Sequence, residues 1–468
     1  METQSKRVLS VFVLAMLNVS IMASLRNLPL IAEFGLSALV FFFLVALFFL
    51  VPCALTSAEL ATGWPKAGGV YAWVREALGD RWGFMAIWMQ WIHNVAWYPV
   101  IMSFIAVTSA YLLSTELASN RGFVISVILV GFWGMTLFNY LGIKISSWFS
   151  TIGVIVGTLL PGAFIISLGL TWISTGRPIQ TEISLDALIP SFQSIGNLVF
   201  LAGLFLAFSG LEVTATYAKN VQHPQKNFPK AITLSAVITL ALFMLGSLAI
   251  AFVIPKAEIN IVEGVMAAFK TFLNHYHLLW ALPVVAFLMI VGAIAEVNSW
   301  IIGPVRGLHA TSAHGNLPPF FQKTNRRNVP TRLLLFQALL VSCTAFIFLY
   351  MPRVSSGFWI LTAMSAQSYL VMYILMFIAA IKLRYSKPHI ERPYRVPFKK
   401  CGIWLFGCMG IASSLFAIAL CFVPPESLRV GNVFTYALLL AGGLFVMCAI
   451  PLCFHAFRKN HWINKHLE

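Results

Sequence analysis

The chain has 468 residues, of which 59% are hydrophobic and only 10% are charged. A soluble domain carries roughly 25% charged residues, and no soluble fold has enough interior for this much apolar surface, so a water-soluble protein is excluded. The formal net charge of +16 could suit a nucleic-acid-binding protein, but the positions of the basic residues argue for a membrane topology instead.

Apolar stretches of membrane-spanning length recur along the whole chain. We predict an all-α polytopic membrane protein with a single transmembrane domain over 1–468, because only helices or closed barrels satisfy their backbone in lipid. The first stretch resembles a signal peptide, but its apolar run continues past Leu28, so we expect an uncleaved span. The twelve expected spans are 8–31, 36–58, 84–113, 122–142, 149–173, 195–218, 231–254, 278–303, 332–350, 357–383, 402–423 and 431–457.

The lysines and arginines are distributed unevenly between the loops. With both termini inside, the expected cytoplasmic segments hold 24 of the 31 Lys and Arg, the external segments hold six, and Arg26 lies within a span. Such a bias predicts cytoplasmic N- and C-termini. The basic loops are therefore topology markers first and contacts for anionic lipid second, and no nucleic-acid partner is expected.

Two of the expected spans are interrupted. The first breaks around Met22-Ala23-Ser24, and the sixth breaks at Ser209-Gly210. Broken helices at matching positions of two repeats mark the substrate site in many secondary transporters, although a simple kink is the alternative. The spacing predicts repeat 1 over about 8–173, repeat 2 over about 195–383 and two extra helices over about 402–457.

Three charged residues fall within apolar spans: Arg26, Glu212 and Glu296. A charge at bilayer depth costs a few kcal/mol or more unless it is paired or faces water or a substrate. The glutamates are candidates for substrate recognition and for proton coupling or gating. Arg26 either clamps a substrate carboxylate or neutralises one of the two glutamates, and the sequence leaves both roles open.

Four segments together resemble the amino acid–polyamine–organocation superfamily of transporters. They are SAELATGWPKAGGVYAWVREALGDRWGF (57–84), FSGLEVTATYAKNVQHPQKNFPKAI (208–232), GPVRGLHATSAHGNLPPFFQKTNRRNVP (303–330) and RPYRVP (392–397). Within the superfamily, EVNSWIIGPVRG (296–307) and YLVMYILMFIAA (369–380) look most like the bacterial glutamate/GABA antiporters. The resemblance implies a leucine-transporter-type fold with a 5+5 inverted repeat plus two helices.

The chain departs from that resemblance at two places near the first break. Met22-Ala23-Ser24 stands where these exchangers have a Gly-rich segment, and Arg26 stands where the glutamate/GABA antiporters have a tyrosine.

The resemblance also implies a binding site. The backbone N–H groups of Ala23 and Ser24 are expected to hold a substrate carboxylate, and Glu296 and Arg26 to read the substrate side chain. Glu212 is the expected gating or proton-sensing carboxylate. The remaining expected site residues are the ammonium-binding carbonyls of Ser20, Leu206 and Ser209, the break at Gly210, the aromatic lid Phe208, and the gating tyrosines Tyr369 and Tyr373, for which packing is the alternative.

Three other features have simpler interpretations. His93 lies among tryptophans in the third span and is interpreted as a core histidine rather than a proton relay. The GVIVG spacing of Gly153 and Gly157 predicts close helix packing. Seven cysteines show no metal or redox spacing, so neither a metal nor a cofactor is expected.

The leading hypothesis is a secondary active amino-acid antiporter, glutamate/GABA-like or for neutral amino acids, that works by alternating access. We expect the protein in a bacterial inner membrane, as a monomer or homodimer. Its expected ligand is an amino acid, and protons are a possible second ligand. A proton-coupled symporter is the main alternative. An integral-membrane enzyme is disfavoured because no HExxH or Walker A motif is found, and a channel because no filter-like repeat is visible.

Overall fold

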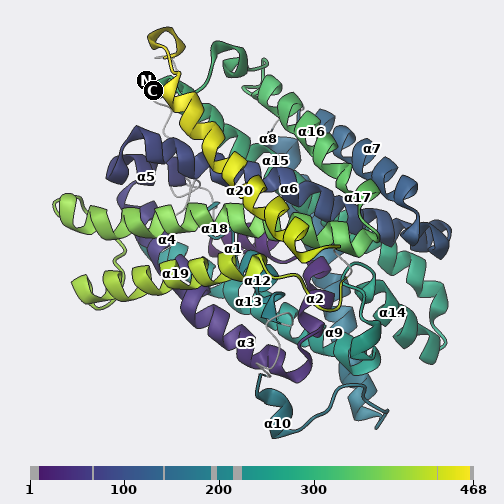
Figure 1. Ribbon diagram of the computed structural model, residues 1–468. Helices are drawn as coiled ribbons and strands as arrows, with labels where there is room; N and C mark the ends of the chain where they lie inside the picture. Colours follow the sequence, from purple (N-terminus) through teal and green to yellow (C-terminus); the bar gives the residue numbers. More distant parts are fainter. Residues whose placement is uncertain are drawn as a thin grey trace.

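The computed structural model describes residues 10–65, 68–140, 143–190, 198–213, 224–428 and 431–463, and these residues form helices and loops without a strand (Figure 1). The helices of the first half are α1 (Val11–Met22), α2 (Leu28–Ala32), α3 (Ala38–Val45), α4 (Val51–Gly63), α5 (Val70–Leu78), α6 (Asp80–Leu113), α7 (Arg121–Asn139), α8 (Ile143–Val154), α9 (Leu160–Ser174) and α10 (Leu185–Leu188). Those of the second half are α12 (Leu201–Ala207), α13 (Pro224–Val253), α14 (Gly264–His275), α15 (Leu282–Ala310), α16 (Thr331–Ala345), α17 (Ile347–Tyr350), α18 (Val354–Ser386), α19 (Lys399–Cys421) and α20 (Val433–Ala456).

The described residues confirm the all-α polytopic fold. Ten helical segments are long and apolar enough to cross a membrane, and α1 with α2 makes a possible eleventh, bent by 43°. The sixth expected span, 195–218, extends outside the described residues at both ends, so the count of twelve stays a prediction, as does the division into repeats.

Several expected span boundaries were wrong by five residues or more. The second span was expected to end at 58, but α4 continues to Gly63. The seventh span was expected from 231, but α13 begins at Pro224. The eighth was expected to end at 303, but α15 continues to Ala310. Hydropathy marks the apolar stretch that crosses the lipid, whereas backbone hydrogen bonding continues the helix into the polar loop.

The molecule is organised around α6, which is buried along most of its length and packs against α15 and α18. Helix α1 lies beside α13, and α19 runs alongside α18 (Figure 1). Helix α20 is peripheral, and its large exposed side chains, among them Phe434, Leu438 and Phe445, form a surface suited to lipid. The three charged residues within the spans, Arg26, Glu212 and Glu296, are buried inside this helix bundle.

Prolines shape the second and fifth expected spans. Each contains one wide π-helical turn, Ala46–Leu50 and Ile155–Leu159, and each turn is followed by a proline, Pro52 and Pro161. Proline lacks the N–H that would bond the carbonyl four residues earlier, and a wider turn accommodates this loss.

The predicted close packing at the GVIVG segment is confirmed. Gly157 meets Gly292 of α15 so closely that a Cβ built on Gly157 would lie 2.1 Å from the Gly292 backbone nitrogen. One turn away, a Cβ on Gly153 would lie 2.3 Å from the Ala295 Cβ. Nearby, Asn298 of α15 bonds Asn139 of α7 at 3.0 Å and Ser150 of α8 at 2.8 Å. Together these contacts fix the part of α15 that carries Glu296 against α7, α8 and the π-helical turn that follows α8.

Glu33 lies in the turn after α2 and is only 7% exposed. Burial raises the pKa of its carboxyl from 4.5 to about 7, against the opposing attraction of Lys256. The folded protein therefore binds this proton more tightly than the unfolded chain, so stability is fully present below about pH 4.5 and declines as the pH rises to about 7.

We therefore expect Glu33→Gln to flatten part of the fall in melting temperature between about pH 5 and 7. The change is checked by thermal unfolding of purified protein across that range. Glu258→Gln, at an exposed position near Lys256, is the matched control and should leave the wild-type slope unchanged. An identical slope for wild type and Glu33→Gln would contradict the assignment.

Candidate substrate site

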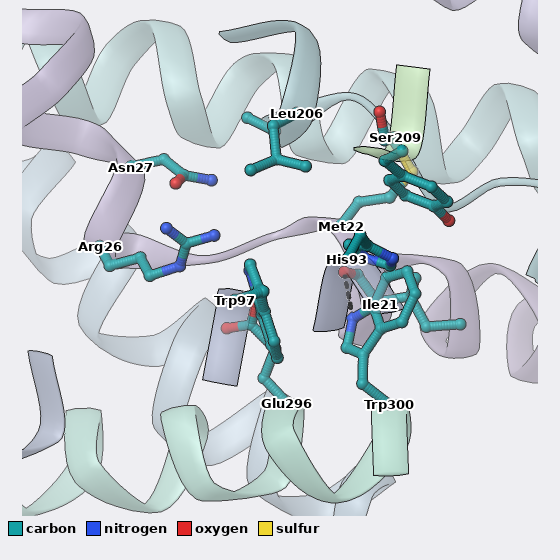
Figure 2. A pocket seen from close by; sticks show the side chains of 12 residues that line it. Ile21, Met22, Arg26, Asn27, His93, Trp97, Leu206, Ser209, Glu296 and Trp300 are labelled. Carbon is teal, nitrogen blue, oxygen red and sulfur yellow. Dashed lines mark hydrogen bonds between the residues drawn. The ribbon is translucent and has the colours of Figure 1, made fainter. Parts of the chain in front are cut away.

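A small cavity lies between the break in the first span and helices α6, α12, α15 and α18 (Figure 2). Its volume is about 20 Å³, room for one or two water molecules. An amino acid would therefore have to displace side chains on entering. The lining residues are Ile21, Met22, Arg26, Asn27, His93, Trp97, Leu206, Ala207, Ser209, Glu296, Trp300 and Tyr369.

The break in the first span lies where the sequence predicted it. Helix α1 ends at Met22, and Ser24 has extended backbone (φ −118°, ψ 120°) before a short 3₁₀ turn. The Ala23 N–H donates to Val19 O at 2.8 Å and so is not available to a substrate in this conformation. The Ser24 N–H has no hydrogen-bond partner among the described residues. Of the two expected carboxylate ligands, only Ser24 has an unused N–H, and neither residue lines the cavity in this conformation.

The break in the sixth span follows α12. The Ser209 N–H donates to Leu206 O at 3.1 Å, which closes the last turn. Gly210 then has φ +116°, and a Cβ there would lie 2.6 Å from Ile21 Cγ2 of the first span. Both the conformation and the close approach require glycine. The two breaks therefore contact each other, as expected for a shared site.

The expected residues around this break separate into two groups. Leu206 and Ser209 line the cavity, whereas Ser20 and Phe208 do not. The Ser20 hydroxyl donates to Leu17 O at 2.8 Å. The Phe208 ring packs against Phe42 and Phe243, at centroid distances of 5.8 and 6.0 Å. In this conformation the aromatic wall of the cavity comes instead from α6, α15 and α18.

Arg26 and Glu296 both line the cavity and come from different segments, Arg26 from the first-span break and Glu296 from α15 (Figure 2). Both are nearly fully buried, at 3% and 4% exposed. Their charges interact, but the ion pairs found among the described residues do not include one between them. The guanidinium lies over the Trp97 ring at 5.4 Å, and Arg26 Nε has no hydrogen-bond partner among the described residues. Arg26 therefore keeps donor capacity for another acceptor.

Glu212 has a separate environment in which three side chains donate to its carboxylate. Gln90 Nε2 donates at 3.0 Å, and the hydroxyls of Tyr369 and Tyr373 donate to the two oxygens. The Tyr373 hydroxyl also accepts the Gly210 N–H at 2.7 Å. The tyrosines therefore do more than pack, because they connect the sixth-span break to α18.

Three aromatic residues of the cavity wall were not among the predicted site residues: His93, Trp97 and Trp300. The His93 ring stacks on Tyr369 with centroids 3.9 Å apart, and its Nδ1 lies 2.6 Å from Gln90 O. Trp300 Nε1 donates to Ile21 O at 3.2 Å, the dashed line in Figure 2. The polar Gln90, His93 and Asn94 at helical spacing in an apolar span were the signal that could have identified this face of α6.

Comparisons with known proteins identify the family of this sequence. The sequence model described as amino acid permease matches residues 9–445. An uncharacterized transporter of Legionella pneumophila is 40% identical over 98% of this chain and 98% of its own. A glutamate/gamma-aminobutyrate antiporter of Lactococcus lactis subsp. lactis is 31% identical over 96% of this chain and 90% of its own.

A more distant relative has a different named substrate. A protein named as a probable agmatine/putrescine antiporter of Lactococcus lactis is 26% identical over 78% of this chain and 77% of its own. The family match nevertheless covers most of the sequence and both helix breaks, so this chain belongs to the amino acid permease family of the amino acid–polyamine–organocation superfamily.

Proposed function

We propose that the protein is a secondary active antiporter for acidic or neutral amino acids and that it works by alternating access. The observation that carries this proposal is the buried Arg26, which lies with Glu296 at a cavity between two broken helices. A desolvated guanidinium favours a carboxylate through two parallel hydrogen bonds.

The backbone groups at the two breaks suit the common part of any α-amino acid. The unused Ser24 N–H offers a donor to the α-carboxylate. The carbonyls of Leu206 and Ser209, next to the cavity, offer acceptors to the ammonium, because carbonyls at a helix end carry partial negative charge. In this proposal the side chain of the substrate extends toward Arg26 and Glu296.

The charge of this site argues against diamines. Arg26 with Glu212 and Glu296 gives a formal charge of −1 when both carboxylates are ionised and +1 when both are protonated. The protonated site repels arginine, agmatine and putrescine and favours an acidic or zwitterionic amino acid. Proton binding in the transport cycle would make symport the main alternative to exchange.

Transport by reconstituted protein tests the proposal. Proteoliposomes should take up labelled glutamate or a neutral amino acid only when they contain unlabelled amino acid. Uptake into empty vesicles driven by a proton gradient would support a symporter instead. Saturable uptake of putrescine or agmatine, without inhibition by glutamate, would reject the proposed substrate class.

Glu296→Gln should leave the protein folded but change its substrate preference or pH optimum. Neutralising this carboxylate removes the negative charge that balances Arg26 and also a group that can bind a proton. Uptake across about pH 5 to 8 should be compared with that of Glu116→Gln, an exposed control. If Glu296→Gln shows the same uptake and substrate specificity as wild type throughout this range, Glu296 does not take part in substrate recognition or proton coupling.

Glu212→Gln should flatten the pH dependence of transport more than it weakens substrate binding. Glu212 does not line the cavity, but its three donors connect α6, α18 and the sixth-span break. Tyr373→Phe removes one of these donors and keeps the charge, so it should slow transport while retaining its pH dependence. If Glu212→Gln loses substrate binding but its residual transport keeps the wild-type pH dependence, the roles proposed for Glu212 and Glu296 must be exchanged.

A further inference from the structure

A basic groove lies between the adjacent ends of α18 and α19, at the end of the molecule that the Lys and Arg distribution predicts to be cytoplasmic. Its volume is about 740 Å³. Five of its ten lining residues are cationic, and the cavity of the substrate site shares none of them. The lining residues are Arg384, Pro388, Arg392, Arg395, Val396, Pro397, Phe398, Lys399, Lys400 and Cys401.

The negative charge around this groove is too small to balance it. Glu59 of α4 pairs with both Arg384 and Arg392 and also accepts the Val396 N–H at 2.8 Å. One carboxylate therefore serves two guanidinium groups. No acidic residue lines the groove, and no ion pair is found for Arg395, Lys399 or Lys400 in the part of the chain that the structure describes.

Two buried arginines show the effect of this imbalance. Burial lowers the pKa of Arg392, and although Glu59 opposes the change, the charges of Arg384 and Arg395 add to it. The Arg384 side chain is nine-tenths buried beside the groove, and its Nε has no hydrogen-bond partner among the described residues. An anion in the groove would relieve the repulsion among these cations.

The first turn of α19 adds backbone donors. This 23-residue helix begins at Lys399, after Phe398 in the left-handed region at φ 62°. Its N-terminus has no side-chain cap and no acidic residue in the first turn. Unsatisfied N–H groups and the positive end of the helix dipole favour a phosphate at this position.

The surroundings of the groove suit a membrane lipid better than a soluble phosphate. Phe398 is 73% exposed at the groove, and Trp404 and Leu405, one turn further along α19, are also exposed. Lys400 lies over the Tyr385 ring at 5.4 Å, and Trp404 donates to the Tyr385 hydroxyl at 2.9 Å. Aromatic side chains beside basic ones are typical of the headgroup region of a bilayer.

We propose that this groove binds the phosphate of an anionic phospholipid headgroup from the cytoplasmic leaflet. Arg395, Lys399 and Lys400 contact the phosphate together with the first N–H groups of α19, and Phe398 and Trp404 contact the upper acyl chains. A membrane topology requires basic loops, but it does not require five cations to line one groove with a single shared carboxylate. The site is independent of the transported substrate.

Lipid retention by the full-length protein tests this site. Purified protein is incubated with equal amounts of phosphatidylglycerol and phosphatidylcholine, and the bound lipid is measured by native mass spectrometry. Wild type should retain phosphatidylglycerol preferentially. Arg395→Gln combined with Lys399→Gln should weaken that retention roughly 30-fold, since each of the two basic contacts near a membrane surface contributes about 1 kcal/mol.

The matched control is Lys323→Gln combined with Arg326→Gln. It removes the same charge from exposed positions at the same expected end of the molecule, and it should retain lipid as wild type does. Equal retention of the two lipids by wild type, or equal losses in the two double variants, would overturn the proposal.

Inorganic phosphate distinguishes the two sources of a phosphate group. Short-chain phosphatidylglycerol should raise the melting temperature of wild type but not of the Arg395→Gln, Lys399→Gln variant, whereas phosphate alone should leave both unchanged. A similar rise with phosphate alone would show a soluble anion site and would reject the lipid. Both double variants change exposed side chains, so size-exclusion profiles should match that of wild type.

Discussion

Arg26→Lys is expected to abolish most transport of an acidic or neutral amino acid while the protein remains folded. The guanidinium is buried over Trp97, and its Nε has no protein partner among the described residues. Lysine would keep the charge but lose the planar pair of donors that matches a carboxylate, and it would stack less well on the indole ring. Truncating such a contact costs about 2 kcal/mol or more, which is roughly a 30-fold loss in kcat/KM.

Counterflow in proteoliposomes measures this effect. Arg353→Lys, at an exposed position, is the control for the same chemical change away from the site. Competition at acid pH should show stronger inhibition by glutamate or neutral amino acids than by arginine or agmatine. Strong inhibition by arginine together with full activity of Arg26→Lys would leave Arg26 as a structural counter-ion of Glu296 and would reject the anionic substrate.

The sequence predicted the features that depend on local composition. Hydropathy located the spans, and the Ser209-Gly210 pair marked a break that the positive φ of Gly210 confirms. The family was also predicted, because its motifs are continuous stretches of sequence. The helix ends at Pro224 and Ala310 were missed because helices continue after their apolar stretch ends.

The pairing of side chains could not be predicted in the same way. The sequence left Arg26 free to balance either glutamate, and packing places it near Glu296, while Gln90, Tyr369 and Tyr373 donate to Glu212. Phe208 was expected beside the site but packs against Phe42. These outcomes depend on how far each helix rotates about its axis, and that rotation is set by contacts with distant segments such as Gly157 and Gly292.

Gly157→Ala tests whether that contact determines the position of α15. In a helix that faced lipid, alanine would be better than glycine by about 1 kcal/mol, so the substitution would stabilise the protein. Here the added methyl group would lie 2.1 Å from the nitrogen and 2.4 Å from the Cα of Gly292. These are backbone atoms that no rotamer change can move, so the two helices must separate. We expect a loss of roughly 3 kcal/mol, within the range for overpacked cores.

Whether Gly157→Ala raises or lowers the melting temperature therefore tests the contact between Gly157 and Gly292. Gly442→Ala, on the peripheral helix α20 with no atom within 4 Å of its added Cβ, should leave the melting temperature unchanged or raise it. Gly157→Ala should lower the melting temperature, and Gly157→Leu should yield no monodisperse protein on size exclusion. A Gly157→Ala protein as stable as Gly442→Ala would show that the π-helical turn Ile155–Leu159 and α15 are further apart in the membrane. The placement of Glu296 near Arg26 would then lose its support, because it depends on the same helix crossing as the Gly157–Gly292 contact.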